Sequence, residues 1–392
     1  MSAFFRWLLR PLWRFWIEPI RAEPVAGFRI LAGLVILWSV TASLGPRMLV
    51  DLGPDGLTPA TAEGEEYHPD PTKSGSVDRW LHKSGKFCIL RGFIGIPLFD
   101  IWLPRAWLGD FVPWVEAGGY WWLFGIYVAS LVCVVLGLFT RISTFVAFLL
   151  TISFQARLSW VLNGGDAVMR DALFYMLLMP AGATWSIDAW LRGKKTGPTM
   201  IEAWSVRLAM IQICCIYFFT GLIKLGGTFA HLGAYFTALW FGGDTGPAIT
   251  ALLNEDWING QAVYWVLNDN ALNRVPYYWL PIPMKVCRLL SWGTILFEVG
   301  FPLFMLLRSV RTWTLVVGVF FHLGIWFHTE VGFFSPIMMA WYPLFLSGES
   351  LAWLVTRRKK PAPVMEANDE SDRPPLEQVP AQTGIAIGER PG

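Results

Sequence analysis

The sequence predicts an all-α polytopic membrane protein with about eight transmembrane helices, both termini in the cytoplasm and two long outer loops. Hydrophobic residues make up 54% of the 392 residues and charged residues only 15%, whereas a soluble domain has about a quarter charged residues. The chain also contains 23 tryptophans, and indole rings favour the membrane–water interface. The net charge of +2 gives no indication of a nucleic-acid partner. The bilayer is therefore the expected partner.

Eight apolar stretches support the predicted number of crossings, since about 20 residues of helix span the hydrocarbon core. They are Val25–Leu44, Tyr120–Leu138, Ile142–Leu162, Asp171–Ala183, Trp204–Leu225, Leu289–Leu307, Trp313–Phe327 and Phe333–Val355. The fourth is short for a full crossing. A further stretch, Cys88–Leu103, contains charged residues and a proline, so we expect it to be interfacial or re-entrant.

The basic residues predict the orientation of these helices. With eight spans, five basic clusters fall on one side: Arg6–Arg21, Arg141, Arg192–Lys195, Arg308–Arg311 and Arg357–Lys360. Short basic loops stay in the cytoplasm, so both termini are predicted there. Three regions follow from this arrangement: a basic cytoplasmic segment 1–24, a transmembrane domain 25–356, and a disordered cytoplasmic tail 357–392 that is rich in Pro, Asp and Glu.

The two longest connections, Gly45–Gly119 and Gly226–Lys285, are predicted to lie outside. The first is rich in Gly, Pro and acidic residues, and the second alternates Trp and Tyr with Asn and Asp. We expect the first to cap the outer face of the helices. The second could form a lid over what lies beneath it.

Lys224 is the most informative residue, because it ends the apolar stretch Trp204–Leu225. An ionisable residue within a span usually marks a functional site, although a lysine near a helix end can also extend its ammonium to the interface. Tyr217, Gly221 and Lys224 have the spacing i, i+4 and i+7 and so share one helical face. That face could be a functional site or a close helix–helix contact built around the glycine.

Two further polar residues lie near the middle of apolar stretches, Glu298 in LFEVGFPLF and His322 in FFHLGIWFH. Each could serve chemistry or be hydrogen-bonded between helices. We expect both to approach the Lys224 face, because an unpaired charge in hydrocarbon is costly. A direct Lys224–Glu298 pair would favour the protonated ammonium, and with it a structural role over a catalytic one. His322 and His328 are six positions apart, which is poor spacing for a metal site.

Polar residues at the predicted ends of spans can be explained by structural roles, without a functional site. Asp166 and Arg170 in NGGDAVMR are spaced for an ion pair within one helix. Ser186 or Asp188 in WSIDAW could cap a helix start. Arg29 lies within a turn or two of a predicted membrane face, so we expect its guanidinium to extend to that face.

Several of these strings together resemble a known family. They are RILAGLVILW, NGGDAVMRDALFY, WSIDAW, QICCIYFFTGLIKL, FEVGFPL and HLGIWFHTEVGFFSPIMMAWYPLF. The chain from about Arg21 to Ser350 resembles the HTTM domain, which vitamin K-dependent gamma-carboxylase shares with many bacterial membrane proteins. The resemblance implies a multi-pass protein of the cell membrane, here a bacterial inner membrane.

The resemblance also implies a site and a cofactor. The lysine matching Lys224 in the carboxylase is the base that activates a quinol, so we expect carboxylase-like, quinol-linked chemistry with His322 and Glu298 as further candidates. Candidate residues for binding substrate or cofactor are Tyr217, Gly221, Gln212, Asn163, Asp166 and Arg170.

Two features of this chain differ from the carboxylase. Ala183 stands where the carboxylase has a histidine, and a short tail replaces its large C-terminal domain. A non-catalytic protein therefore stays open as an alternative. It would be either a carrier of an apolar small molecule or a subunit of a redox assembly.

Overall fold

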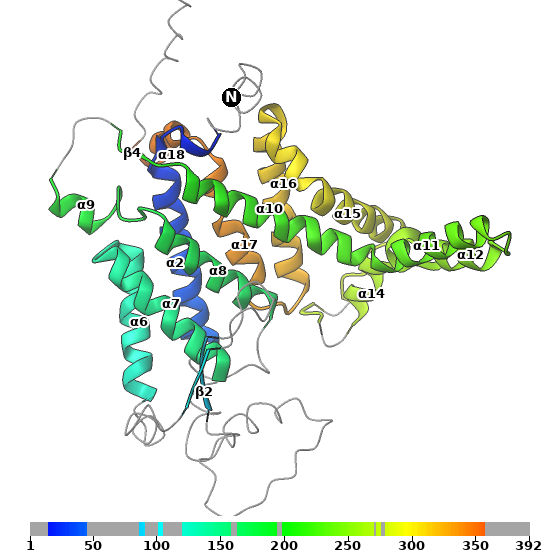
Figure 1. Ribbon diagram of the computed structural model, residues 1–392, viewed down its shortest axis with the longest axis horizontal. Coiled ribbons are helices and arrows are strands. Elements are labelled where there is room, and N and C mark those ends of the chain that lie inside the picture. Colours follow the sequence, from blue (N-terminus) through cyan, green and yellow to red (C-terminus); the bar gives the residue numbers. More distant parts are fainter. Residues whose placement is uncertain are drawn as a thin grey trace, which may run out of the picture.

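A computed structural model describes residues 15–44, 86–90, 101–104, 120–157, 163–193, 198–269, 272–275 and 279–356. In these residues the chain is predominantly helical (Figure 1). Most of the predicted segment 1–24, most of the predicted loop Gly45–Gly119 and the whole of the predicted tail 357–392 lie outside the described residues.

The helices are α2 (Glu23–Ser39), α6 (Tyr120–Leu136), α7 (Thr140–Arg157), α8 (Gly164–Leu178), α9 (Ile187–Leu191), α10 (Trp204–Lys224), α11 (Gly226–Trp240), α12 (Gly246–Asn254), α13 (Asp256–Asn259), α14 (Ala262–Asn268), α15 (Met284–Leu306), α16 (Arg308–His328), α17 (Phe334–Ala340) and α18 (Gly348–Thr356), with the short helical turns η1 (Val40–Leu44) and η6 (Tyr342–Phe345). The strands are β1 (Ile20–Arg21), β2 (Lys86–Leu90), β3 (Ile101–Pro104) and β4 (Met200–Ile201). They form two antiparallel pairs, β1 with β4 and β2 with β3.

Four helices of the described chain are long and apolar enough to cross a membrane: Glu23–Ala42, Trp204–Lys224, Met284–Leu306 and Arg308–His328. Each of them overlaps a predicted span. The helices α6 and α7 are apolar but shorter, and α8 has 15 residues. The chain is thus a helical membrane protein, while its eight crossings and their orientation stay a prediction.

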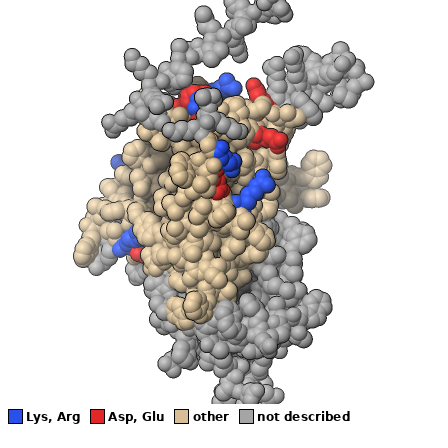
Figure 2. Space-filling view, turned by 90° about the vertical axis from the view of Figure 1, so that its left-hand side faces the viewer, with Lys and Arg blue, Asp and Glu red and all other residues tan. Residues whose placement is uncertain are grey.

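The outer surface of the helices suits a lipid environment. Large apolar side chains such as Trp122 on α6 and Phe145 on α7 are exposed. Figure 2 shows the side of the molecule that carries these helices. Most of that face is free of Lys, Arg, Asp and Glu, and most of its charged side chains gather in the upper half. Because an exposed apolar surface of this size is unfavourable in water, we assign it to contact with lipid.

Two predicted segments differ in the structure. The stretch Phe333–Val355 is not one continuous helix but α17, η6 and α18 in succession. Pro343 lies at the start of η6 and Gly348 at the start of α18, and both residue types interrupt helices. The predicted outer loop Gly226–Lys285 consists largely of helices α11 to α14. The described ends of a third stretch, Cys88–Leu103, belong to the β2–β3 hairpin; its middle lies outside the described residues, so its interfacial or re-entrant character stays a prediction.

Arg29 on α2 is fully buried, so the expectation that it extends to a membrane face is wrong. Its guanidinium donates hydrogen bonds to the backbone carbonyls of Ala181 and Trp185. Gly137, at φ +68°, packs against it, and a Cβ there would overlap the guanidinium. Arg29 therefore attaches the connection after α8 to α2, because the free carbonyls of this connection need donors.

The connection between α8 and α9 also holds the start of α7. Ser186 caps α9 by accepting a hydrogen bond from the N–H of Ala189 at 2.9 Å, as predicted. The Asp188 carboxylate reaches the start of α7, where it accepts from the N–H groups of Phe139 and Thr140, each at 2.8 Å. Partial burial acts to raise the pKa of Asp188, but these bonds and that from the Thr140 hydroxyl hold it below its ordinary value.

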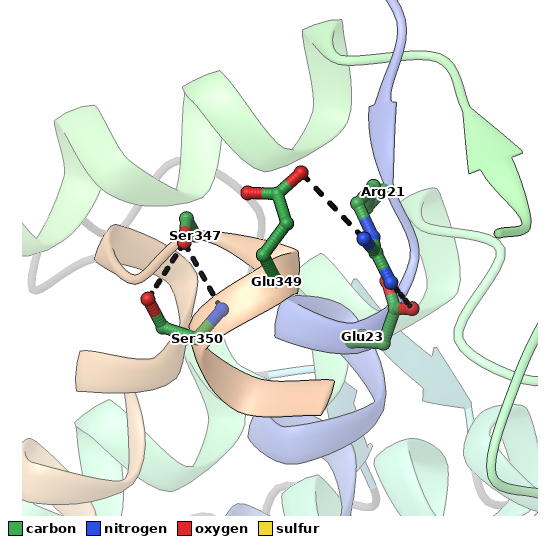
Figure 3. Close-up of polar contacts among 5 residues, drawn as sticks. All are labelled: Arg21, Glu23, Ser347, Glu349 and Ser350. Carbon is green, nitrogen blue, oxygen red and sulfur yellow. Dashed lines mark hydrogen bonds and ion pairs between the residues drawn. The ribbon is translucent and has the colours of Figure 1, made fainter. Parts of the chain in front are cut away.

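At the same end of the bundle, α2 and α18 are joined by charged side chains (Figure 3). Arg21 contacts Glu23 at 2.6 Å and Glu349 at 3.5 Å. Ser347 caps α18 by accepting from the N–H of Ser350 at 3.1 Å. These contacts join β1 and the start of α2 to the start of α18.

Candidate functional site

The candidate site begins on one face of α10. The helix ends at Lys224, and the N–H of the next residue, Leu225, still bonds back to the carbonyl of Gly221. Tyr217 and Gly221 are buried on this helix, and their spacing from Lys224 places all three on one face. The predicted face is therefore formed, and the helices α15 and α16 supply its partners.

Lys224 and Glu298 form a direct ion pair. The lysine Nζ lies 2.8 Å from Oε1 and 2.7 Å from Oε2 of the carboxylate. The side chain of Lys224 is 25% exposed and that of Glu298 only 8%. The ammonium also lies 5.5 Å from the centre of the Trp257 ring, within cation–π range. Both charges of the pair are thereby compensated within the protein.

This pairing bears directly on the chemistry of Lys224. A carboxylate at this distance favours the charged ammonium over the neutral amine. We expected a direct pair to favour a structural role for the lysine, and a direct pair is present. A base at Lys224 therefore requires that its proton first move elsewhere.

Gly221 lets the two helices approach closely enough for the pair to form. A Cβ at this position would lie 2.7 Å from Cγ2 and 3.1 Å from the backbone nitrogen of Val299, and 3.1 Å from Cβ of Glu298. Only glycine leaves room for the α15 backbone at this point. The contact between α10 and α15 thus depends on the residue one turn before the lysine.

A second polar group lies two turns earlier on the same face. The hydroxyl of Tyr217 is 2.6 Å from Nε2 of His322 and 2.7 Å from the hydroxyl of Tyr342. Tyr217 has one O–H to donate, so it donates to one of these partners and accepts from the other. The three side chains are buried, and His322 faces α10 as expected. They form a short hydrogen-bonded relay between α10, α16 and η6.

Aromatic rings surround this relay. The ring of Tyr217 stacks on Phe301 with 4.1 Å between centroids and meets Phe297 edge-on at 5.5 Å. Nδ1 of His322 is buried and has no hydrogen-bond partner among the residues that the structure describes. A buried polar atom of this kind usually has a partner. The relay therefore ends at an unsatisfied nitrogen in an aromatic environment, where the His322 ring meets Phe321 and Phe334 edge-on.

The remaining predicted residues lie elsewhere. Gln212 donates to Asp171 at 3.3 Å and accepts from Tyr175 at 3.4 Å, so it links α10 to α8. Asn163 and Asp166 form a capping box at the start of α8, where the Asp166 carboxylate accepts from the N–H of Asn163 at 2.8 Å. The box gives these two residues a role in starting α8, and the ion pair expected between Asp166 and Arg170 stays a prediction.

Sequence reasoning did not single out Tyr342 and Trp257. Tyr342 lies in η6, inside a stretch that the sequence presents as a continuous apolar span. Trp257 lies in α13, inside a stretch that reads as a loop. No spacing in the sequence relates either residue to α10.

Together, the helices and the buried polar face define a membrane protein with an intramembrane polar site. The chain belongs to the HTTM domain family, whose model matches residues 105–240 and 248–349. The matched residues contain Lys224, Glu298, His322 and Tyr342, whereas α2 precedes them. No curated protein and no solved structure matches this chain.

Proposed function

We propose that this HTTM protein is a membrane enzyme that removes a proton from a lipid-soluble quinol-class molecule, and that the Lys224–Glu298 pair takes up this proton. The observation that carries the proposal is the pair itself, with both carboxylate oxygens within 2.8 Å of the ammonium. Placing an ion pair in an apolar span is energetically costly, so its presence indicates a function. A quinol, when bound, supplies acidic hydroxyl protons and two electrons.

The residues of the site suit such a molecule. The rings of Phe297, Phe301 and Tyr217 offer apolar walls for an aromatic ring. The unpartnered Nδ1 of His322 could bond to a hydroxyl or carbonyl oxygen. The fit thus rests on an unsatisfied buried nitrogen and on the aromatic side chains beside it.

The proton transfer follows from the short contact within the pair. Lys224 first passes a proton from Nζ to the Glu298 carboxylate, which leaves a neutral amine beside a neutral carboxyl group. A dry environment favours this uncharged form relative to water. Nζ can then accept a proton from a hydroxyl, and the pair as a whole has gained one proton. Glu298 thus serves as the proton store that makes Lys224 available as a base.

Extraction of the purified protein tests this proposal. Quinones and other lipids from the unaltered protein are compared with those from Lys224→Ala and from Gly293→Ala. Gly293 lies on α15, and a Cβ there meets nothing within 4 Å, so this variant is a matched control. We expect a quinone-class molecule with the unaltered protein and the control but not with Lys224→Ala. Equal recovery from all three proteins would count against the site.

A second candidate function is non-catalytic, and the same contact favours it. The Glu298 carboxylate compensates the charge of the ammonium, and Gly221 brings α10 and α15 together beside the pair. In this function Lys224 and Glu298 clamp two helices of a carrier or of a redox subunit. The clamp needs a permanent cation, whereas the base needs a cation that can lose its proton. Arginine at position 224 separates the two, because a guanidinium keeps its proton.

A further inference from the structure

The helices α11 and α12 form an arm, residues 226–254, that extends sideways from the bundle (Figure 1). The arm begins directly after the candidate span α10, with only Leu225 between them. The arm therefore continues a helix that is long and apolar enough to cross a membrane.

The arm has almost no charge. From Gly226 to Asn254 the sequence contains one Asp, Glu, Lys or Arg residue, Asp244 at the tip. His231 lies at the base, where Nε2 is 2.8 Å from Oε1 of Glu255. The Thr237 hydroxyl donates to the carbonyl of Gly233 within its own helix, which satisfies it without water. The sides of the arm are therefore suited to an apolar surrounding.

Large apolar side chains on the arm are exposed. Trp240 is 85% and Phe241 80% exposed, and Phe229, Phe236 and Leu239 are also exposed. A hairpin with so many exposed aromatic rings would be unfavourable in water. Indole rings, in contrast, are favoured at the boundary between headgroups and acyl chains.

We infer that the α11–α12 arm lies in one leaflet of the bilayer, where its partner is lipid rather than water or a second protein. Three observations support lipid: the exposed apolar side chains of the arm, its continuity with a candidate span, and the lack of charge along its sides. The arm is thus a membrane-embedded element in a stretch that the sequence presents as an outer loop. The inference requires only that the protein is in a membrane and does not depend on the proposed reaction.

Site-directed fluorescence in nanodiscs tests this inference. Cysteine is placed at Phe236, Leu239 or Trp240 and labelled with the environment-sensitive dye NBD. Ile223→Cys on α10, where the isoleucine is 77% exposed, is the control for a lipid-facing position in a span. Trp190→Cys on α9, where the tryptophan is 73% exposed, is the control for a position outside the candidate spans. The unaltered protein, labelled in parallel, gives the signal of the native cysteines.

Two quenchers are then compared: a phosphatidylcholine with a nitroxide on its acyl chain, and iodide in the buffer. We expect the three arm positions to behave like Ile223→Cys, with a blue-shifted emission that the nitroxide lipid removes and iodide does not. Quenching by iodide, as expected for Trp190→Cys, would overturn the inference. Protection from both quenchers would overturn it as well, because the arm would then be covered by protein, such as a second copy of the chain.

Discussion

Lys224, the last residue of α10, is held by Glu298, which lies just past the middle of the 23-residue helix α15. The ammonium of Lys224 is therefore directed toward the interior of a neighbouring span. A lysine that only extended its stem to the interface would not need a buried carboxylate. The pair is consequently the feature on which the candidate function depends.

Loss of either partner should destabilise the protein more than loss of both. Lys224→Met leaves the Glu298 carboxylate unpaired, and Glu298→Leu leaves the ammonium unpaired, whereas the double variant removes both charges. Because Lys224 is partly exposed, we expect a coupling energy of about 2 kcal/mol rather than the larger values of fully buried pairs. Unfolding in detergent measures it. The exposed pair Arg274–Glu330 is the control and should couple by less than about 1 kcal/mol.

Tyr217→Phe should be more harmful than Tyr342→Phe. The first removes both hydrogen bonds of the relay and leaves Nε2 of His322 without a partner, at a cost of about 1–3 kcal/mol. The second keeps the contact between Tyr217 and His322. Thermal unfolding of the two variants measures the difference. Equal destabilisation would show that the hydroxyl of Tyr217 does not hold the relay together.

Gly221→Ala should separate α10 from α15. The added Cβ meets Val299 at 2.7 Å, and overpacking of this kind costs about 1–3 kcal/mol. Gly293→Ala on α15 meets nothing within 4 Å, so it should be neutral or slightly stabilising, since alanine favours helix. A Gly221→Ala protein as stable as Gly293→Ala would contradict the close helix contact.

Asp188 should contribute to stability at neutral pH and lose its contribution in acid. Its pKa is lowered in the folded protein, so the contribution is complete above the unfolded pKa of about 4 and disappears as the pH falls through the folded value. Asp188→Asn, which weakens the cap on α7, should cost about 1 kcal/mol at pH 7. The gap between the two proteins should close in acid. A gap that does not change with pH would exclude the charge as its cause.

Reporter fusions test the predicted orientation. Fusions after Lys195, Arg311 and Lys360 should report the cytoplasm and one after Asp269 the outside, because the short basic clusters stay inside. An outside signal after Lys195 would place the loop before α10 outside the cell. It would then place Lys224 at the cytoplasmic side of the membrane and contradict the predicted orientation.

The sequence was sufficient for the class of protein, for the span that ends in Lys224, and for the approach of Glu298 and His322 to its face. These follow from hydropathy and from the cost of an unpaired charge in a membrane. The sequence could not place Tyr342 beside Tyr217. That contact depends on the break between α17 and η6 and on how α16 packs against these elements, and neither is visible in the residue pattern. Arg29 was misjudged for a similar reason. Its partners are the backbone carbonyls of Ala181 and Trp185. Every residue has a backbone carbonyl, so the sequence does not show which carbonyls lack a partner within their own helix.

The most direct test of the central claim is complementation of a deletion strain by Lys224→Arg, with protein level and thermal stability matched to the unaltered protein. If Lys224 must release a proton to act as a base, the Lys224→Arg protein should fold and accumulate but fail to restore the lost phenotype, since a guanidinium keeps its proton. Full restoration by Lys224→Arg would contradict the proposed proton transfer and leave the ion pair with Glu298 as a clamp between two helices.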